Sequence, residues 1–250
     1  MSATTIDEVI DQLTDIVEAC RTDASRNGYF ACLYRGVTRE VRTKIANGHF
    51  EDNPRMEQLV VRFANRYLDA YNQYAHGEQC SRSWQVAFKQ AETSSYLVLQ
   101  HLMLGMNAHI YLDLGIAAAE TAPGEALPGL EMDFIAINHL LASMVNAVQD
   151  SLAAVSPWLG WLDVVGGGHD ETIANFNMRE ARDSAWNLAL KLAAQTEAER
   201  AETIQRRDDA VADFASIITR PGLTLGAVIF LIWLRERREA AHIIEVMGGG

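Results

Sequence analysis

Apolar residues recur along most of the chain at the three- to four-residue spacing of amphipathic α-helices. In the first segment this spacing runs over 6–20, and Thr5 with Glu8 three positions later forms a capping box at its start. The same spacing predicts helices over 38–48, with the first residue as N-cap, and over 53–77, where a proline takes the first helical position. No segment alternates apolar and polar residues between turn signals, as a half-buried β-strand does. The pattern therefore predicts an all-α fold.

The following segments are more apolar. A helix that starts near Ser83 continues, with a break near 93–95, into a run that is apolar on every side and ends near Ala119. Further helices are predicted over 133–154, 173–207, 208–219 and 223–247, and a loop over 122–129. The longer interruption over 156–171 is expected to be a mobile flap. A helix that is apolar all round belongs at the centre of a fold.

These elements predict one domain over 1–247, a multi-helix bundle around a central buried helix at about 96–119. The glycines at 248–250 are expected to form a flexible tail. The apolar stretch 223–234 has 12 residues, fewer than the roughly 20 that cross a bilayer, so we expect no stable membrane insertion despite the basic residues that follow it.

Charge narrows the classes of partner. The chain carries 33 acidic and 21 basic residues, a formal net charge of −12, and this excess disfavours binding to nucleic acid or to anionic lipid.

The three cysteines, Cys20, Cys32 and Cys80, show no CxxC spacing and suggest neither a disulfide framework nor a thiolate zinc site. With no signal-peptide pattern at the N-terminus, we expect a cytoplasmic protein. Whether it forms a homo-oligomer stays open.

Four polar side chains interrupt the apolar central helix, and they are the candidates for chemistry: His101, Asn107, His109 and Asp113. A buried polar group without a partner costs a few kcal/mol, so such groups are kept when they are satisfied or used. His109 and Asp113 are four residues apart and start about 5–6 Å from each other on one helix face. His101 lies about 12 Å further along the axis, so whether it acts in the same site stays open.

The His109–Asp113 pair allows three interpretations. It can be a carboxylate-oriented imidazole that acts as general acid or base, or half of a site for one divalent metal, zinc or iron, completed by other helices. It can also be a satisfied polar network that fixes helix register. The spacing alone does not choose among them.

Residues on other helices are candidates for binding a substrate. Arg182 shares a helix side with Trp186, which places a guanidinium beside apolar surface where it can hold Asp113 or a substrate anion. Alternatively, its stem packs while its head reaches water. Asn138 borders an apolar stripe, and Asn107 points to nearly the opposite side of the central helix from His109.

The central segment resembles the hallmark of DUF5995, a microbial family of unknown function. The similar run is Leu-Gln-His-Leu-Met-Leu-Gly-Met-Asn-Ala-His-Ile-Tyr-Leu-Asp-Leu-Gly-Ile-Ala at 99–117. Shorter similar pieces lie at 28–30, 34–38, 50–52, 63–67, 83–84, 133–138, 182–186 and 220–222. The resemblance implies that His101, Asn107, His109, Asp113 and Arg182 occupy hallmark positions, and it implies no activity.

We predict a small-molecule enzyme in which His109, His101 and Asp113 are catalytic, while Asn107, Asn138, Arg182 and Trp186 bind the substrate. Hydrolase, isomerase, cyclase and lyase chemistry all stay open, because no nucleophile elbow, Walker loop or dinucleotide fingerprint is present. The alternative is a non-catalytic ligand-binding or scaffold protein.

Overall fold

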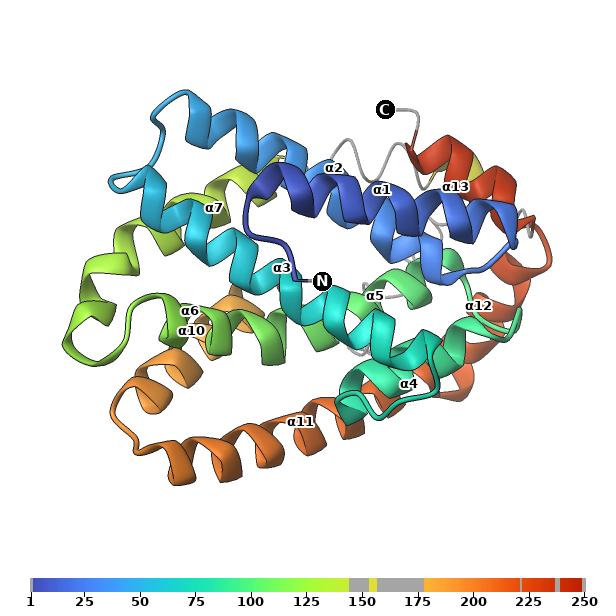
Figure 1. Ribbon diagram of the computed structural model, residues 1–250. Helices are drawn as coiled ribbons and strands as arrows, with labels where there is room; N and C mark the ends of the chain where they lie inside the picture. Colours follow the sequence, from blue (N-terminus) through green and yellow to red (C-terminus); the bar gives the residue numbers. More distant parts are fainter. Residues whose placement is uncertain (1, 144–152, 157–177, 221, 237–238, 249–250) are drawn as a thin grey trace.

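The computed structural model describes residues 2–143, 153–156, 178–220, 222–236 and 239–248 (Figure 1). Within these ranges all regular structure is helical, which confirms the predicted all-α class. The first part of the chain forms α1 (Ile6–Thr22), α2 (Asn27–Ala46), α3 (Asn53–Ala75) and α4 (Arg82–Ala91). The last part forms α10 (Met178–Ala193), α11 (Glu197–Thr219), α12 (Leu223–Trp233) and α13 (Ala240–Gly248).

The predicted central helix is a continuous rod, Val98–Thr121, built from α5 (Val98–Ala108), a π-helical turn (His109–Asp113) and α6 (Leu114–Thr121). By length and composition alone the rod is apolar enough to cross a membrane, yet 89% of its most apolar window is buried by other parts of the fold. That burial is expected for a core helix. The break predicted near 93–95 precedes the rod and is confirmed.

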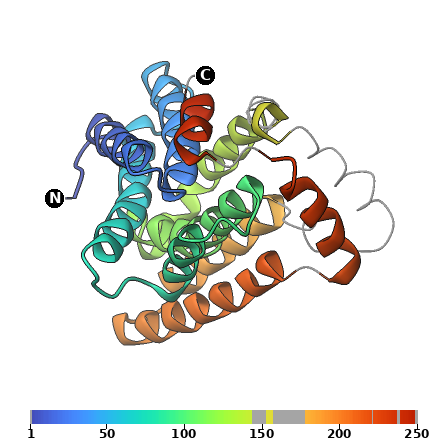
Figure 2. The same ribbon diagram turned by 90° about the vertical axis from the view of Figure 1, so that its right-hand side faces the viewer.

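Helices cover the rod from two sides. In Figure 1, α1 and α2 lie above it and α11 below it, and Figure 2 shows α13 against α2. The face of the rod at Gly115 meets α10 closely, since an added Cβ would lie 2.6 Å from the carbonyl oxygen of Ala185. The opposite face, with His109 and Asp113, receives side chains from α2, α3 and α4.

A buried carboxylate from α11 fixes the start of α4. Asp208 accepts hydrogen bonds from the backbone N–H groups of Arg82 at 2.6 Å and Ser83 at 2.8 Å. The first N–H groups of a helix have no partner within the helix, so this carboxylate caps α4 from a distant part of the chain. The position of Trp84, one residue later, follows from this cap.

The start of the second helix was predicted wrongly. Thr38 lies inside α2, where its hydroxyl donates to the carbonyl oxygen of Tyr34, one turn earlier, at 2.8 Å. A threonine that bonds back in this way is compatible with a helix interior. The helix begins at Asn27 without a side-chain cap, so its start carries no capping signal.

Two boundaries near the C-terminus were also predicted wrongly. The break expected between 207 and 208 lies inside α11, and the true boundary is marked by the capping box of Thr196 and Glu199. The single helix expected over 223–247 is two helices, α12 and α13.

Most of the predicted loop 122–129 forms a short 3₁₀ helix, Gly124–Leu130, followed by α7 (Glu131–Ser143).

Other predictions fall partly or wholly outside the described residues. The predicted flap lies outside the described residues except for Ser156, as does the stretch 144–152 of the predicted helix 133–154. Of the predicted glycine tail, Gly248 ends α13 and 249–250 lie outside.

Candidate functional site

His109 and Asp113 are the first and last residues of the π-helical turn in the central rod. A π turn inserts one extra residue into an α-helix, is rare, and is found frequently at functional sites. Here it separates α5 from α6 at the level where α2, α3 and α4 meet the rod. The backbone irregularity and the polar pair therefore coincide.

The carboxylate of Asp113 is 1% exposed and receives three donors. Arg66 of α3 donates from Nε to Oδ1 at 2.9 Å, and Trp84 of α4 donates from Nε1 to Oδ2 at 2.7 Å. Nδ1 of His109 lies 3.3 Å from the same Oδ2. Burial raises the pKa of Asp113, but Arg66, His109 and Trp84 together hold it below its usual value. Asp113 is therefore ionised at neutral pH.

The imidazole of His109 is neutral and oriented. Burial lowers the pKa of His109, and the charge of Arg66 lowers it further, against the raising effect of Asp113. A neutral imidazole has one donor and one acceptor nitrogen, and an ionised carboxylate only accepts. Nδ1 therefore carries the hydrogen toward Asp113, which leaves the lone pair of His109 on Nε2.

Aromatic rings surround His109, which is 3% exposed. Phe63 of α3 stacks on the imidazole with ring centroids 3.6 Å apart and planes within 7°. Tyr34 of α2 meets it edge-on at 4.5 Å. The rings of Phe30, Tyr67 and Trp84 complete what we call the His109 cage. This apolar surrounding is the cause of the desolvation that keeps the imidazole uncharged.

Among the described residues, three buried polar atoms of the His109 cage have no hydrogen-bond partner: Nε2 of His109 and the hydroxyl oxygens of Tyr34 and Tyr67. The two tyrosine rings lie 5.9 Å apart. Burial, followed by the negative charge of Asp113, raises the pKa of Tyr34, so this hydroxyl stays protonated. An unsatisfied buried donor or acceptor costs about 1–3 kcal/mol, and three in one place need an explanation.

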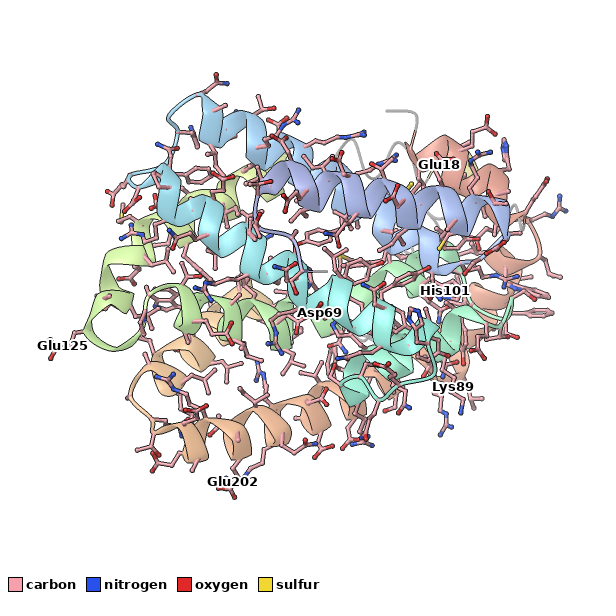
Figure 3. The ribbon with its side chains drawn as sticks, viewed as in Figure 1. Glu18, Asp69, Lys89, His101, Glu125 and Glu202 are labelled. Carbon is pink, nitrogen blue, oxygen red and sulfur yellow. The ribbon has the colours of Figure 1, made fainter. Side chains whose placement is uncertain are left out.

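His101 occupies a separate environment two turns earlier on the rod. Figure 3 draws it within the bundle, whereas the labelled Glu125 and Glu202 project outward. It is 6% exposed, and the rings of Tyr29 and Tyr96 meet it edge-on. Burial, followed by the charge of Arg26, lowers the pKa of His101 to about 4. Neither ring nitrogen has a hydrogen-bond partner within the described part of the chain.

Two of the predicted substrate-binding residues, Asn107 and Trp186, make their contacts away from His109. Asn107 donates to the carbonyl oxygen of Val211 in α11 at 2.9 Å, on the other side of the rod. Trp186 of α10 packs against Phe134 with ring centroids 4.9 Å apart. Asn138 lies in α7, and its side chain is not among those described.

Arg182 of α10 makes no described hydrogen bond or ion pair with His109 or Asp113. It is 5% exposed, and burial lowers its pKa to about 10. Among the described residues no carboxylate lies within ion-pair distance of Arg182. The guanidinium at Asp113 is that of Arg66 instead.

Besides Phe30, five residues that build the site were not predicted from the sequence: Tyr34, Phe63, Arg66, Tyr67 and, as a hydrogen-bond donor, Trp84. Their spacing on α2, α3 and α4 is that of ordinary amphipathic helices, so periodicity gives no signal for a site. The available signal was the resemblance, whose shorter segments 34–38, 63–67 and 83–84 contain all five.

The metal interpretation has less support from the geometry than the acid–base interpretation. Both oxygens of Asp113 already accept hydrogen bonds from Arg66, Trp84 and His109. Within the described part of the chain, no three side chains among His, Cys, Asp and Glu gather in a way that could hold a metal ion. Asp113 is placed to orient His109 rather than to ligate an ion beside it.

Comparison with known proteins gives one match. A family model described as "Family of unknown function (DUF5995)" matches residues 6–221. No curated protein and no solved structure matches the chain. The matched range contains the whole His109 cage and ends just before α12.

Proposed function

The chain belongs to the DUF5995 family, whose description gives no activity, and from the site itself we propose acid–base chemistry on a small polar molecule held in the His109 cage. In this proposal His109 is the general base, and Nε2 takes a proton from the bound molecule or from water. Asp113 fixes the tautomer and stabilises the imidazolium that forms, as a carboxylate does in a His–Asp pair.

The tyrosine hydroxyls supply the complementary donors. Tyr34 and Tyr67 both keep their protons, because burial raises the pKa of each well above its usual value. Buried donors are strong stabilisers of negative charge that develops on an oxygen in a transition state. A molecule whose carbonyl oxygen accepts from the two hydroxyls, and whose own acidic hydrogen faces the lone pair on Nε2, would use all three unpartnered atoms. Hydrolysis, isomerisation, cyclisation and elimination remain candidate reactions.

The observation that carries the proposal is the contrast between the two ends of the network. Both oxygens of Asp113 are paired, while Nε2 of His109 and the hydroxyls of Tyr34 and Tyr67 have no partner among the described residues. A purely structural network is expected to satisfy all of its members. The unpaired end is where a ligand gains hydrogen bonds.

The experiment is retention of small molecules by the purified protein. Wild type is equilibrated with a mixture of small carbonyl compounds, carboxylic acids, esters and amides, desalted, and examined by native mass spectrometry. We expect a bound component that is lost in His109→Gln and in Tyr34→Phe. The matched control is Tyr71→Phe, which removes a hydroxyl that contacts the sulfur of Cys20 outside the cage. Equal retention by all variants, or by none, would count against the proposal.

The metal version is tested separately. Wild-type protein purified without a metal-affinity step is analysed for zinc, iron and manganese, beside His109→Ala and Asp113→Ala. A stoichiometric metal that both variants lose would replace the acid–base assignment. The absence of any such metal in wild type would remove the metal version.

A second candidate function is a scaffold in which the pair fixes the register of the central helix. The tight stacking of Phe63 on His109 favours it, because packing this close leaves no room beside that ring face. Under this alternative His109→Ala lowers the melting temperature and no small molecule is retained by wild type.

A further inference from the structure

A narrow cleft opens beside His101, where α2, α4 and α5 meet. Its lining includes Arg26, Asn27, Phe30, Trp84, His101 and Gly105, together with small and aromatic residues of α4. Its volume is about 20 Å³, room for about one water molecule. Arg26 and Asn27 are only partly buried, whereas Phe30 and Trp84 are buried, so the cleft has a polar mouth and an aromatic inner end.

His101 gives the cleft an unsatisfied polar wall. The side chain is more than nine-tenths buried, and both ring nitrogens are without partners. A neutral imidazole offers one donor and one acceptor. Arg26 and Asn27, at the start of α2, add further donors at the mouth, beside the positive end of a 20-residue helix. These groups suit a small molecule with an acceptor oxygen, such as a carbonyl or carboxylate.

The inner end of the cleft is the back of the His109 cage. Phe30 and Trp84 line the cleft, and their ring centroids also lie 5.7 Å and 5.9 Å from that of His109. Trp84 is tied by its hydrogen bond to Asp113. The ring of Phe30 has no hydrogen-bonding group and is held by packing against Tyr34, Tyr67 and Trp84.

Gly105 explains how Phe30 closes the cage. It lies on the rod midway between His101 and His109, and an added Cβ would be 2.5 Å from Cδ2 of Phe30. The missing side chain lets the ring of Phe30 lie against the rod between the two histidines. His101, Gly105 and His109 thus form one line from the cleft to the cage.

We infer that the cleft beside His101 is the outer end of a passage to His109, that Phe30 is the gate, and that His101 holds the acceptor group of an entering small molecule. The inference rests on the proposed function only in assigning His109 as the destination. It moves His101 from a catalytic role to a positioning role at the entrance.

The test is the rate at which diethyl pyrocarbonate modifies His109, followed by peptide mass spectrometry. This reagent is a small carbonyl compound that acylates neutral imidazole, and the measurement needs no turnover. Variants are Phe30→Ala, the milder Phe30→Leu, Phe63→Ala, and Phe50→Ala as a matched core truncation in another cluster. Thermal melts establish that each variant is folded at the labelling temperature.

We expect His109 to react at least about tenfold faster in Phe30→Ala than in Phe50→Ala, and at an intermediate rate in Phe30→Leu. Only the two substitutions of Phe30 open the passage. Faster labelling in Phe63→Ala than in Phe30→Ala would overturn the inference, since the approach would then cross the outer face of α3. Equal rates in Phe30→Ala and Phe50→Ala would overturn it as well, because labelling would then follow general loosening. Failure of the retention experiment leaves these rates unaffected, so the two proposals fail separately.

Discussion

The indole N–H of Trp84 donates to Oδ2 of Asp113 at 2.7 Å, the same oxygen that faces Nδ1 of His109 at 3.3 Å. Trp84 is held in place because Asp208 of α11 caps the start of α4 one residue earlier. The orientation of His109 therefore depends on a chain of contacts from α11 through α4 to the rod.

The first prediction concerns Trp84→Phe, which removes the donor and keeps an aromatic ring. We expect the free energy of unfolding to fall by about 2–3 kcal/mol, because a buried hydrogen bond to a charged group is lost. Urea denaturation measures the change. The control is Trp186→Phe, since Trp186 makes a ring contact with Phe134 and has no hydrogen bond among those described. Equal losses in both variants would show that ring size alone matters.

The second prediction concerns the charge of Asp113. Asp113→Asn retains the shape but leaves Arg66, whose side chain is 28% exposed, without its partner. We expect a loss of about 3 kcal/mol in the free energy of unfolding, the usual cost of removing one member of a buried pair. Asp213→Asn breaks an exposed pair with Arg82 and should cost less than about 1 kcal/mol. A loss in Asp113→Asn no larger than in Asp213→Asn would contradict the assignment.

Periodicity and capping predicted the fold class, the central helix and the starts of α1 and α3, because these depend on local contacts. They failed at α2, which starts without a side-chain cap. They also failed at α12 and α13, because both helices are apolar and were predicted as one continuous helix. The π turn at His109 was also beyond reach. It lies where side chains of α2, α3 and α4 reach the rod, and helical periodicity does not specify it.

The site was predicted in part. The interruption of an apolar helix by His109 and Asp113 correctly indicated a buried pair, since burial makes polar residues conspicuous. The partner of Asp113 was not predictable, because Arg66 and Arg182 are equally plausible on amphipathic helices, and only the packing of α3 against the rod decides between them.

The third prediction concerns the pH dependence of stability. His101 has a pKa of about 4 in the fold and about 6.5 when unfolded. The unfolded chain therefore binds the proton first, so stability is lost as the pH falls from about 6.5 toward 4. Between pH 7.5 and 5 the loss from this group is about 2 kcal/mol.

Chemical denaturation of His101→Gln at the two pH values measures that loss. The variant should be less sensitive to acid than wild type by about 2 kcal/mol. The matched control is His49→Gln, which changes an exposed histidine. Identical pH dependence in His101→Gln and wild type would mean that His101 is solvated.

The fourth prediction concerns the unpartnered hydroxyl of Tyr34. Tyr34→Phe removes a buried polar atom that has no hydrogen bond, so the free energy of unfolding should stay the same or rise by about 1 kcal/mol. Tyr71→Phe removes a hydroxyl that contacts Cys20 and should not raise stability. Differential scanning calorimetry of both variants without added ligand measures the difference. A clear loss of stability in Tyr34→Phe would show that this hydroxyl has a partner.

The last prediction compares two glycines that both lie inside helices. At Gly105 an added Cβ meets the ring of Phe30 at 2.5 Å, so Gly105→Ala must push that ring toward the cage and should cost about 1–3 kcal/mol. At Gly36 in α2 an added Cβ meets nothing within 4 Å, so Gly36→Ala should raise stability by about 0.5–1 kcal/mol through helix propensity.

The double variant Gly105→Ala with Phe30→Ala separates the clash from a backbone effect. If the ring of Phe30 is what the new methyl group meets, Gly105→Ala should cost much less in the Phe30→Ala background than in wild type, because the two changes act on one contact. Gly36→Ala should be additive with Phe30→Ala. Additivity of Gly105→Ala instead would mean that the ring of Phe30 does not lie against the rod between His101 and His109.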